Sequence, residues 1–109
     1  MKLTSQEPQF IRYGRNDAGN EKWTHVDTLA EAQGIYFTCP VCDDGHAVAV
    51  TFADRGVPDD LGSSNGERPT RWQVSGTGYA DLTLNPSIDL TKRANCTWHG
   101  WIREGKVIV

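Results

Sequence analysis

The chain has 109 residues, of which 38% are hydrophobic, and a formal net charge of −3. This length predicts one domain with a modest core. A weakly acidic chain without a long basic run argues against nucleic-acid binding driven by phosphate neutralisation. No apolar stretch approaches the length of a membrane span, and the first residues lack the apolar centre of a signal peptide. We therefore expect a cytoplasmic protein.

Two short strands and one helix are expected in the first third of the chain. The segments 9–13 and 23–26 contain the aromatic and β-branched residues that favour strands. The segment 27–34 is expected to form a short helix, because Thr28 and Glu31 have the spacing of a capping box. A helix of this length must pack against other elements to be stable.

The rest of the chain is expected to form antiparallel strands joined by turns. The apolar segments 35–38 and 47–53 predict a hairpin, and the Gly-, Ser- and Pro-rich segment 54–70 predicts a long loop. The pair Asn85-Pro86 is expected to end a strand. Further strands are expected at 71–74, 81–84, 98–103 and 106–109.

These elements predict a single domain, residues 1–109, with a mainly β fold of the β-rich α+β type. We expect six or seven short antiparallel strands, in small sheets or a partly open barrel, and one short helix. Residues 1–34 are expected to form an N-terminal extension that contains the helix. Residues 35–109 are expected to form the core.

Two pairs of candidate metal ligands are the sharpest chemical signal. Cys39 and Cys42 are separated by two residues in the turn of the first predicted hairpin, and Cys96 and His99 have the same spacing near the C-terminus. A tight turn can direct both side chains of a pair at one ion. Three thiolates and one imidazole make a tetrahedral set that suits Zn²⁺. The sequence therefore predicts a zinc-ribbon-like site that joins two distant parts of the chain.

This ligand set has alternatives. His46 follows Cys42 in the same turn, and it could replace His99 or bind as a fifth ligand. A solvated loop histidine is the simpler interpretation of His46. The cysteines could instead be small buried apolar side chains that bind no metal.

The sequence shows no recognised catalytic motif. Four protein ligands would close a zinc site, whereas a catalytic zinc keeps one position for water. The HExxH motif and the H-x-E pattern of the cytidine deaminases are missing from the sequence. Ser75, Ser87 and the histidines do not form a recognised nucleophile motif. A catalytic role is therefore not expected.

Two tryptophans lie beside His99. On a strand at 98–103, Trp98 points to the face opposite His99, and Trp101 shares the face of His99. We expect these side chains to pack in the core or to shield the metal, because large aromatic residues mostly serve packing. A stacking platform for bases or a peptide is the alternative.

Four segments together carry a resemblance to a known family. They are CPVC (39–42), RWQVSG (71–76), LTLNPSI (82–88) and CTWHGWIREGKV (96–107). Over residues 35–109 the chain resembles a small family of unknown function from bacteria and their phages, which has CxxC, TLxPSI and CxxHGxIRxG motifs. The resemblance implies a zinc-bound β domain without an established activity. It also implies the metal ligands Cys39, Cys42, Cys96 and His99.

The function predicted from these features is that of a zinc-stabilised, non-catalytic binding or accessory domain whose partner is a protein. One alternative is a small metal-dependent hydrolase with an open zinc position near Asp43, Asp44 or His46. The other is a nucleic-acid-binding accessory protein, with the tryptophans and a set of basic residues as contacts: Arg68, Arg71, Lys92 and Arg93. No membrane partner is expected.

Overall fold

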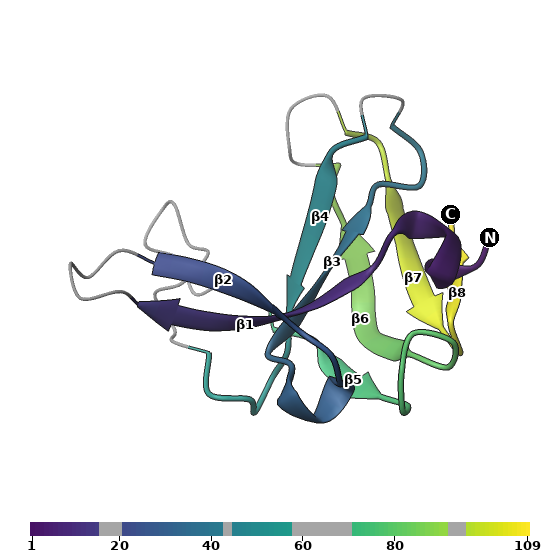
Figure 1. Ribbon diagram of the computed structural model, residues 1–109. Coiled ribbons are helices and arrows are strands. Elements are labelled where there is room, and N and C mark those ends of the chain that lie inside the picture. Colours follow the sequence, from purple (N-terminus) through teal and green to yellow (C-terminus); the bar gives the residue numbers. More distant parts are fainter. Residues whose placement is uncertain (16–20, 43–44, 58–70, 92–95) are drawn as a thin grey trace.

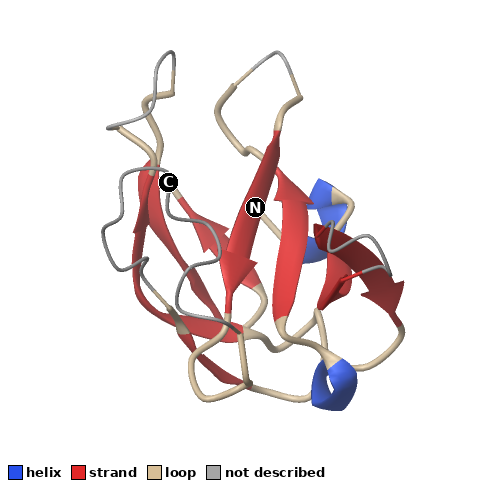
Figure 2. Cartoon of the chain, turned by 90° about the vertical axis from the view of Figure 1, so that its left-hand side faces the viewer, coloured by secondary structure: helices blue, strands red, loops and turns tan. Residues whose placement is uncertain are grey.

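In the computed structural model of the chain, the described residues form two four-stranded antiparallel sheets (Figures 1 and 2). The structure describes residues 1–15, 21–42, 45–57, 71–91 and 96–109. Apart from strands, these residues contain two short 3-10 turns. The mainly β fold expected from the sequence is therefore confirmed.

The first sheet has the strand order β2-β1-β3-β4. The hairpin predicted at 35–53 is present, with Ile35 of β3 opposite Val50 of β4. Strand β1 pairs with β3, so the predicted N-terminal extension contributes strands to the same sheet as the predicted core (Figure 1). The bounds are β1 (Gln9–Arg15), β2 (Glu21–Val26), β3 (Gly34–Thr38) and β4 (Ala47–Thr51).

The second sheet has the strand order β5-β6-β7-β8. The start of the chain closes its outer edge, because the backbone N–H of Val107 donates to the carbonyl of Met1 at 2.8 Å. The two termini consequently lie side by side at β8 (Figure 1). The bounds are β5 (Gln73–Ser75), β6 (Thr83–Asp89), β7 (His99–Arg103) and β8 (Lys106–Ile108).

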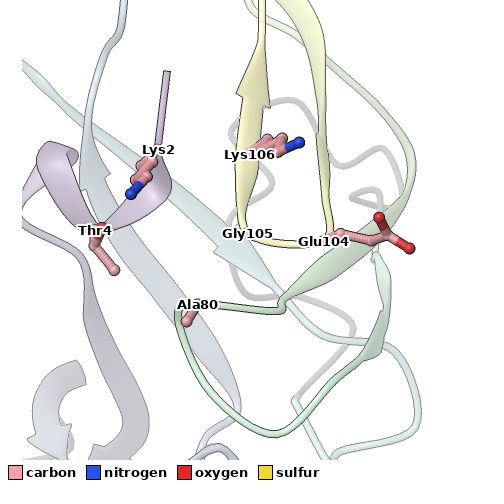
Figure 3. Close-up of a pocket in the computed structure, with 6 residues that line it drawn as sticks. All are labelled: Lys2, Thr4, Ala80, Glu104, Gly105 and Lys106. Carbon is pink, nitrogen blue, oxygen red and sulfur yellow. The ribbon is translucent and has the colours of Figure 1, made fainter.

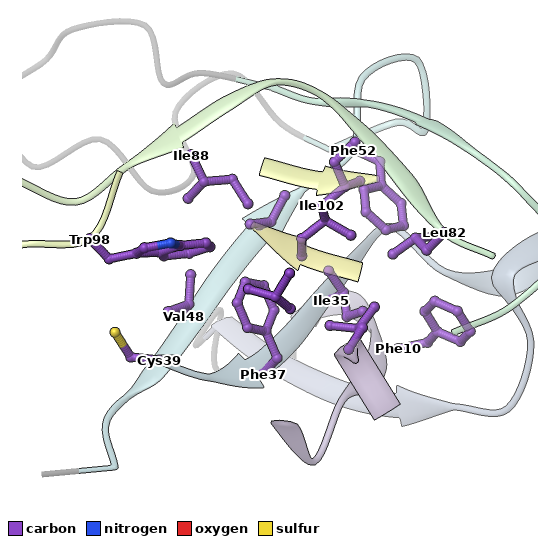
Figure 4. Close-up of a cluster of buried hydrophobic side chains, with 14 of the residues drawn as sticks. Phe10, Ile35, Phe37, Cys39, Val48, Phe52, Leu82, Ile88, Trp98 and Ile102 are labelled. Carbon is purple, nitrogen blue, oxygen red and sulfur yellow. The ribbon is translucent and has the colours of Figure 1, made fainter. Parts of the chain in front are cut away.

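The core lies between the two sheets (Figure 4). Along β4, Val48 and Val50 are buried while Ala47 and Ala49 are exposed, which is the alternation of a strand with one buried face. Each large apolar side chain buried in this way stabilises the fold by about 1.5–3 kcal/mol. The largest fully buried side chains include Phe10, Ile35, Phe37, Phe52, Leu84, Ile88, Trp98 and Ile102.

The helix predicted at 27–34 is shortened to a 3-10 turn, Leu29–Glu31. Its predicted cap is confirmed, because the Thr28 hydroxyl accepts a hydrogen bond from the Glu31 backbone N–H at 3.4 Å. The turn cannot continue because the chain enters β3 at Gly34. No helix of the described residues is long and apolar enough to span a membrane.

The prediction that Asn85-Pro86 ends a strand is wrong. Strand β6 continues through this pair to Asp89. The strand tolerates proline because it is bulged there: Leu84 pairs with Ile102 and Ile88 with Gly100, so residues 85–87 all lie opposite Trp101. A bulge leaves its extra residues outside the hydrogen-bonded ladder, where a missing backbone N–H costs little.

Candidate metal centre and serine–histidine site

Cys39, Cys42, His46 and Cys96 form a group that could hold a metal ion. Their four ligand atoms all lie within 4.8 Å of one another. The Sγ atom of Cys96 is 3.6 Å from that of Cys42 and 3.9 Å from that of Cys39. These distances are far longer than the ~2.05 Å of a disulfide bond. They match the edge of about 3.8 Å that a tetrahedron with metal–sulfur bonds of 2.3 Å would have.

Two parts of the chain bring these ligands together. The β3–β4 turn carries Cys39, Cys42 and His46, and it is closed by a hydrogen bond of 3.0 Å from the Cys39 backbone N–H to the His46 carbonyl. Cys96 comes from the segment that leads into β7. The site therefore joins one sheet to the other at one end of the core.

The thiols of this group influence one another. Burial, together with hydrogen bonds to Cys96 and Cys39, raises the pKa of the Cys42 thiol to about 12. A hydrogen bond from the Trp98 backbone lowers the pKa of Cys96. Without a cation, close thiols cannot all ionise cheaply, whereas a bound metal ion favours the thiolates. The donor set thus fits a soft divalent metal ion.

The structure brings together three of the four predicted ligands. Cys39, Cys42 and Cys96 are members of this group, and His99 is not. The fourth member is His46, the alternative ligand in the sequence, which lies in the same turn as Cys39 and Cys42. The His99 side chain points to the outer face of the second sheet, since its neighbour Gly100 is on the buried face.

His99 instead contacts a serine. Its Nε2 atom lies 3.0 Å from the Oγ atom of Ser87, within hydrogen-bond distance. His99 is exposed and Ser87 is half-buried, so the pair is open to solvent on the outer face of the sheet. A serine hydroxyl that contacts an imidazole is the arrangement of a nucleophile and its general base.

The bulge in β6 places Ser87 in this position. Asp89 pairs with His99, and Ile88 pairs with Gly100 on the buried face, so Ser87 lies on the outer face as a diagonal neighbour of His99. The bulge is held by Trp72, whose indole N–H donates to the Ser87 carbonyl at 3.3 Å. The half-buried Trp72 ring packs against the core.

The His99 ring also contacts an aromatic side chain on its own strand. The rings of His99 and Trp101 are stacked, with centroids 5.7 Å apart and planes inclined by 24°. The guanidinium of Arg103 lies over the Trp101 ring, 5.3 Å from its centroid. In the described part of the chain, no carboxylate hydrogen-bonds to His99. The Asp89 carboxylate accepts from the backbone N–H and the hydroxyl of Thr91.

Sequence reasoning missed the Ser87–His99 pair because it ended the strand at Pro86. A strand continued through Pro86 would have kept Ser87 within β6, but its register against His99 depends on the bulge. The faces predicted for the tryptophans are nevertheless confirmed, since Trp101 shares the outer face with His99 and Trp98 is buried in the core.

Of the other basic candidates from the sequence, one lies within the described residues. Arg71 donates to the hydroxyl of Thr51 at 2.8 Å. The remaining basic and acidic candidates lie outside the described residues: Asp43, Asp44, Arg68, Lys92 and Arg93.

A pocket of about 210 Å³ lies at the other end of β7, beside the β7–β8 turn (Figure 3). It contains none of the candidate metal ligands and neither Ser87 nor His99. Its lining consists of Lys2, Thr4, Ala80, Glu104, Gly105 and Lys106.

Comparison with known proteins identifies the family. The sequence profile that matches residues 11–109 is described as BubE, a bacterial ubiquitination-like system serine protease. No curated protein and no solved structure matches the chain. The description names an activity, so the expectation of a family without one is not confirmed. Because the match covers most of its length, the chain belongs to the BubE family of bacterial ubiquitination-like system serine proteases.

Proposed function

We propose that this protein is a serine protease in which Ser87 is the nucleophile and His99 is the general base. The observation that carries the proposal is the distance of 3.0 Å between Ser87 Oγ and His99 Nε2. The description of the family supports the same reaction class. The exposed position of the pair allows a polypeptide to reach it.

The reaction follows from this geometry. Ser87 Oγ attacks the carbonyl carbon of the scissile peptide bond, and its proton passes to His99 Nε2. The tetrahedral intermediate collapses, the C–N bond breaks, and the leaving amine takes the proton from His99. A water molecule then attacks the Ser87 ester while His99 accepts a proton from that water. The acid product leaves, and Ser87 regains its proton.

The metal site has a structural role in this proposal. Cys39, Cys42, His46 and Cys96 would hold Zn²⁺ in a closed tetrahedral site, which supplies folding free energy and no reactive position. Cys96 is three residues before His99, and the Trp98 carbonyl between them accepts from the Leu90 backbone N–H at 2.9 Å. The metal would therefore fix the start of β7, where the general base lies.

The substrate is proposed to be a protein of a ubiquitination-like system, because the family description names such a system. Three cysteines grouped at one metal site are typical of a reducing compartment, which favours the cytoplasm. We therefore propose a protease in place of the non-catalytic binding domain that was expected from the sequence. The following experiment tests this choice.

Labelling with a fluorophosphonate tests the nucleophile without knowledge of the substrate. We expect stoichiometric phosphonylation of the purified protein, with loss of fluoride, at Ser87 by peptide mass spectrometry. Ser87→Ala should abolish labelling. The matched control is Ser75→Ala, which removes an exposed hydroxyl from β5 of the same sheet and should label at the wild-type rate.

An unlabelled wild-type protein, or equal labelling of Ser87→Ala and the wild type, would contradict the proposed protease. The non-catalytic binding domain would then be the better interpretation.

A further inference from the structure

Within the described ranges, no carboxylate hydrogen-bonds to His99 in the way that the acid of a catalytic triad would. In a triad the acid holds the imidazole in place and stabilises the imidazolium that forms during attack. In the described residues, the ring contacts of His99 are the hydrogen bond with Ser87 and the stack on Trp101. Trp101 is therefore the side chain placed to orient the base.

We propose that Trp101 is a positioning residue that replaces the triad acid in orienting His99 toward Ser87. This inference rests on the proposed protease function. The inclination of 24° between the two rings places the imidazole over an aromatic face.

The surroundings of Trp101 make it a firm support. It is half-buried and is the one β7 residue opposite the bulge at 85–87. On its other side it pairs with Ile108 of β8. Arg103 lies over its ring, so the indole is held between neighbours on its own strand. Trp101 and the proposed nucleophile, Ser87, thus both lie at the bulge of the β6–β7 pair.

Two substitutions distinguish the effect of an aromatic ring at position 101 from the effect of a bulky apolar side chain. Trp101→Phe keeps a ring beneath His99, and Trp101→Leu keeps an apolar side chain without a ring. The matched control is Trp23→Leu, which removes a half-buried tryptophan from β2, where its partner is Tyr13.

The experiment measures fluorophosphonate labelling of Ser87 in the full chain, with the maximal rate constant separated from the apparent affinity. We expect Trp101→Leu to lower the maximal rate constant about ten-fold or more, because a misplaced base costs rate more than binding. Trp101→Phe should stay within about three-fold of the wild type, since it restores the stacked face. Trp23→Leu should label at the wild-type rate.

A spectroscopic readout accompanies the rates. The His99 ring protons of the wild type and Trp101→Phe should show the upfield NMR shift caused by a stacked ring, and Trp101→Leu should lose it. If Trp101→Leu does not fold, Trp101→Phe decides the question.

Each unfavourable result has its own meaning. A wild type that is not labelled would overturn the protease and this inference with it. Labelling of Trp101→Leu at the rate of Trp23→Leu would overturn the role of Trp101 alone. A rate for Trp101→Phe more than ten-fold below the wild type would also overturn it, because the ring would then not be sufficient.

Discussion

Two histidines that look equivalent in the sequence have different environments in the structure. His46 lies with Cys39 and Cys42 in one turn, so its ring is close to the thiols. His99 follows Cys96 with the spacing of a ligand pair, but it is the first residue of a strand. The alternation of that strand turns its ring to the outer face, toward Ser87.

Single substitutions should separate the roles of these two histidines. We expect His46→Ala to bind less than one equivalent of metal, because a ligand is lost. His99→Ala should keep its metal but slow labelling of Ser87 by about 10²–10⁴-fold, the usual contribution of a general base. Elemental analysis of the purified variants measures their metal content, and the fluorophosphonate reaction measures their labelling rate. Full metal content in His46→Ala with loss of metal in His99→Ala would restore the ligand set predicted from the sequence.

At the scale of elements, the β5–β6 connection supports the strand that carries the nucleophile. The Asp81 carboxylate accepts from the backbone N–H groups of Thr77 and Gly78, both at 2.9 Å, and from the Thr77 hydroxyl at 2.8 Å. The hydrogen bonds from Thr77 and Gly78 lower the pKa of Asp81. The ionised carboxylate therefore stabilises this turn.

The lowered pKa predicts how stability depends on pH. Because the pKa of Asp81 is lower in the folded state than its ordinary value of about 3.9, its contribution is present above that value and is lost as pH falls through the folded pKa. We expect Asp81→Asn to unfold more easily than the wild type at pH 7, and the difference to vanish in acid. Denaturant titrations of both proteins from pH 7 to pH 2.5 measure it. A difference that stays constant over this range would show that the carboxylate charge has no part in it.

At the scale of the whole molecule, the candidate metal site connects the two sheets at one end of the core. The β3–β4 turn of the first sheet and the segment before β7 of the second sheet both supply ligands. The same segment leads within three residues to His99. In the proposed protease, a metal ion bound at this site would therefore link folding stability to the position of His99.

Removal of the metal ion should lower both the stability of the fold and the labelling rate of Ser87. We expect a chelator, or Cys96→Ser, to lower the melting temperature by at least about 10 °C, because a closed Cys₃His site supplies several kcal/mol in a domain of this size. Labelling of Ser87 should slow in parallel, and added Zn²⁺ should restore the rate and the melting temperature of the chelated protein. A metal-free protein with an unchanged melting temperature and labelling rate would contradict a structural metal.

The mainly β fold could be predicted from local patterns in the sequence, because period-two alternation and turn residues act over a few neighbouring residues. The sequence also indicated that the three cysteines belong to one candidate metal site, because Cys39 and Cys42, and likewise Cys96 and His99, have the spacing of a ligand pair. The sequence could not show whether His46 or His99 lies near the three cysteines. The spacing between two residues does not reveal to which face of a strand their side chains point.

The Ser87–His99 pair, by contrast, arises from the way β6 and β7 pair in the folded protein. Pro86 is a strong local signal for the end of a strand, and the pairing of β6 with β7 overrides it by forming a bulge. The two extra residues in that bulge set the register in which Ser87 becomes a diagonal neighbour of His99. Register depends on contacts between strands and on the core beneath them, so no pattern within one segment specifies it.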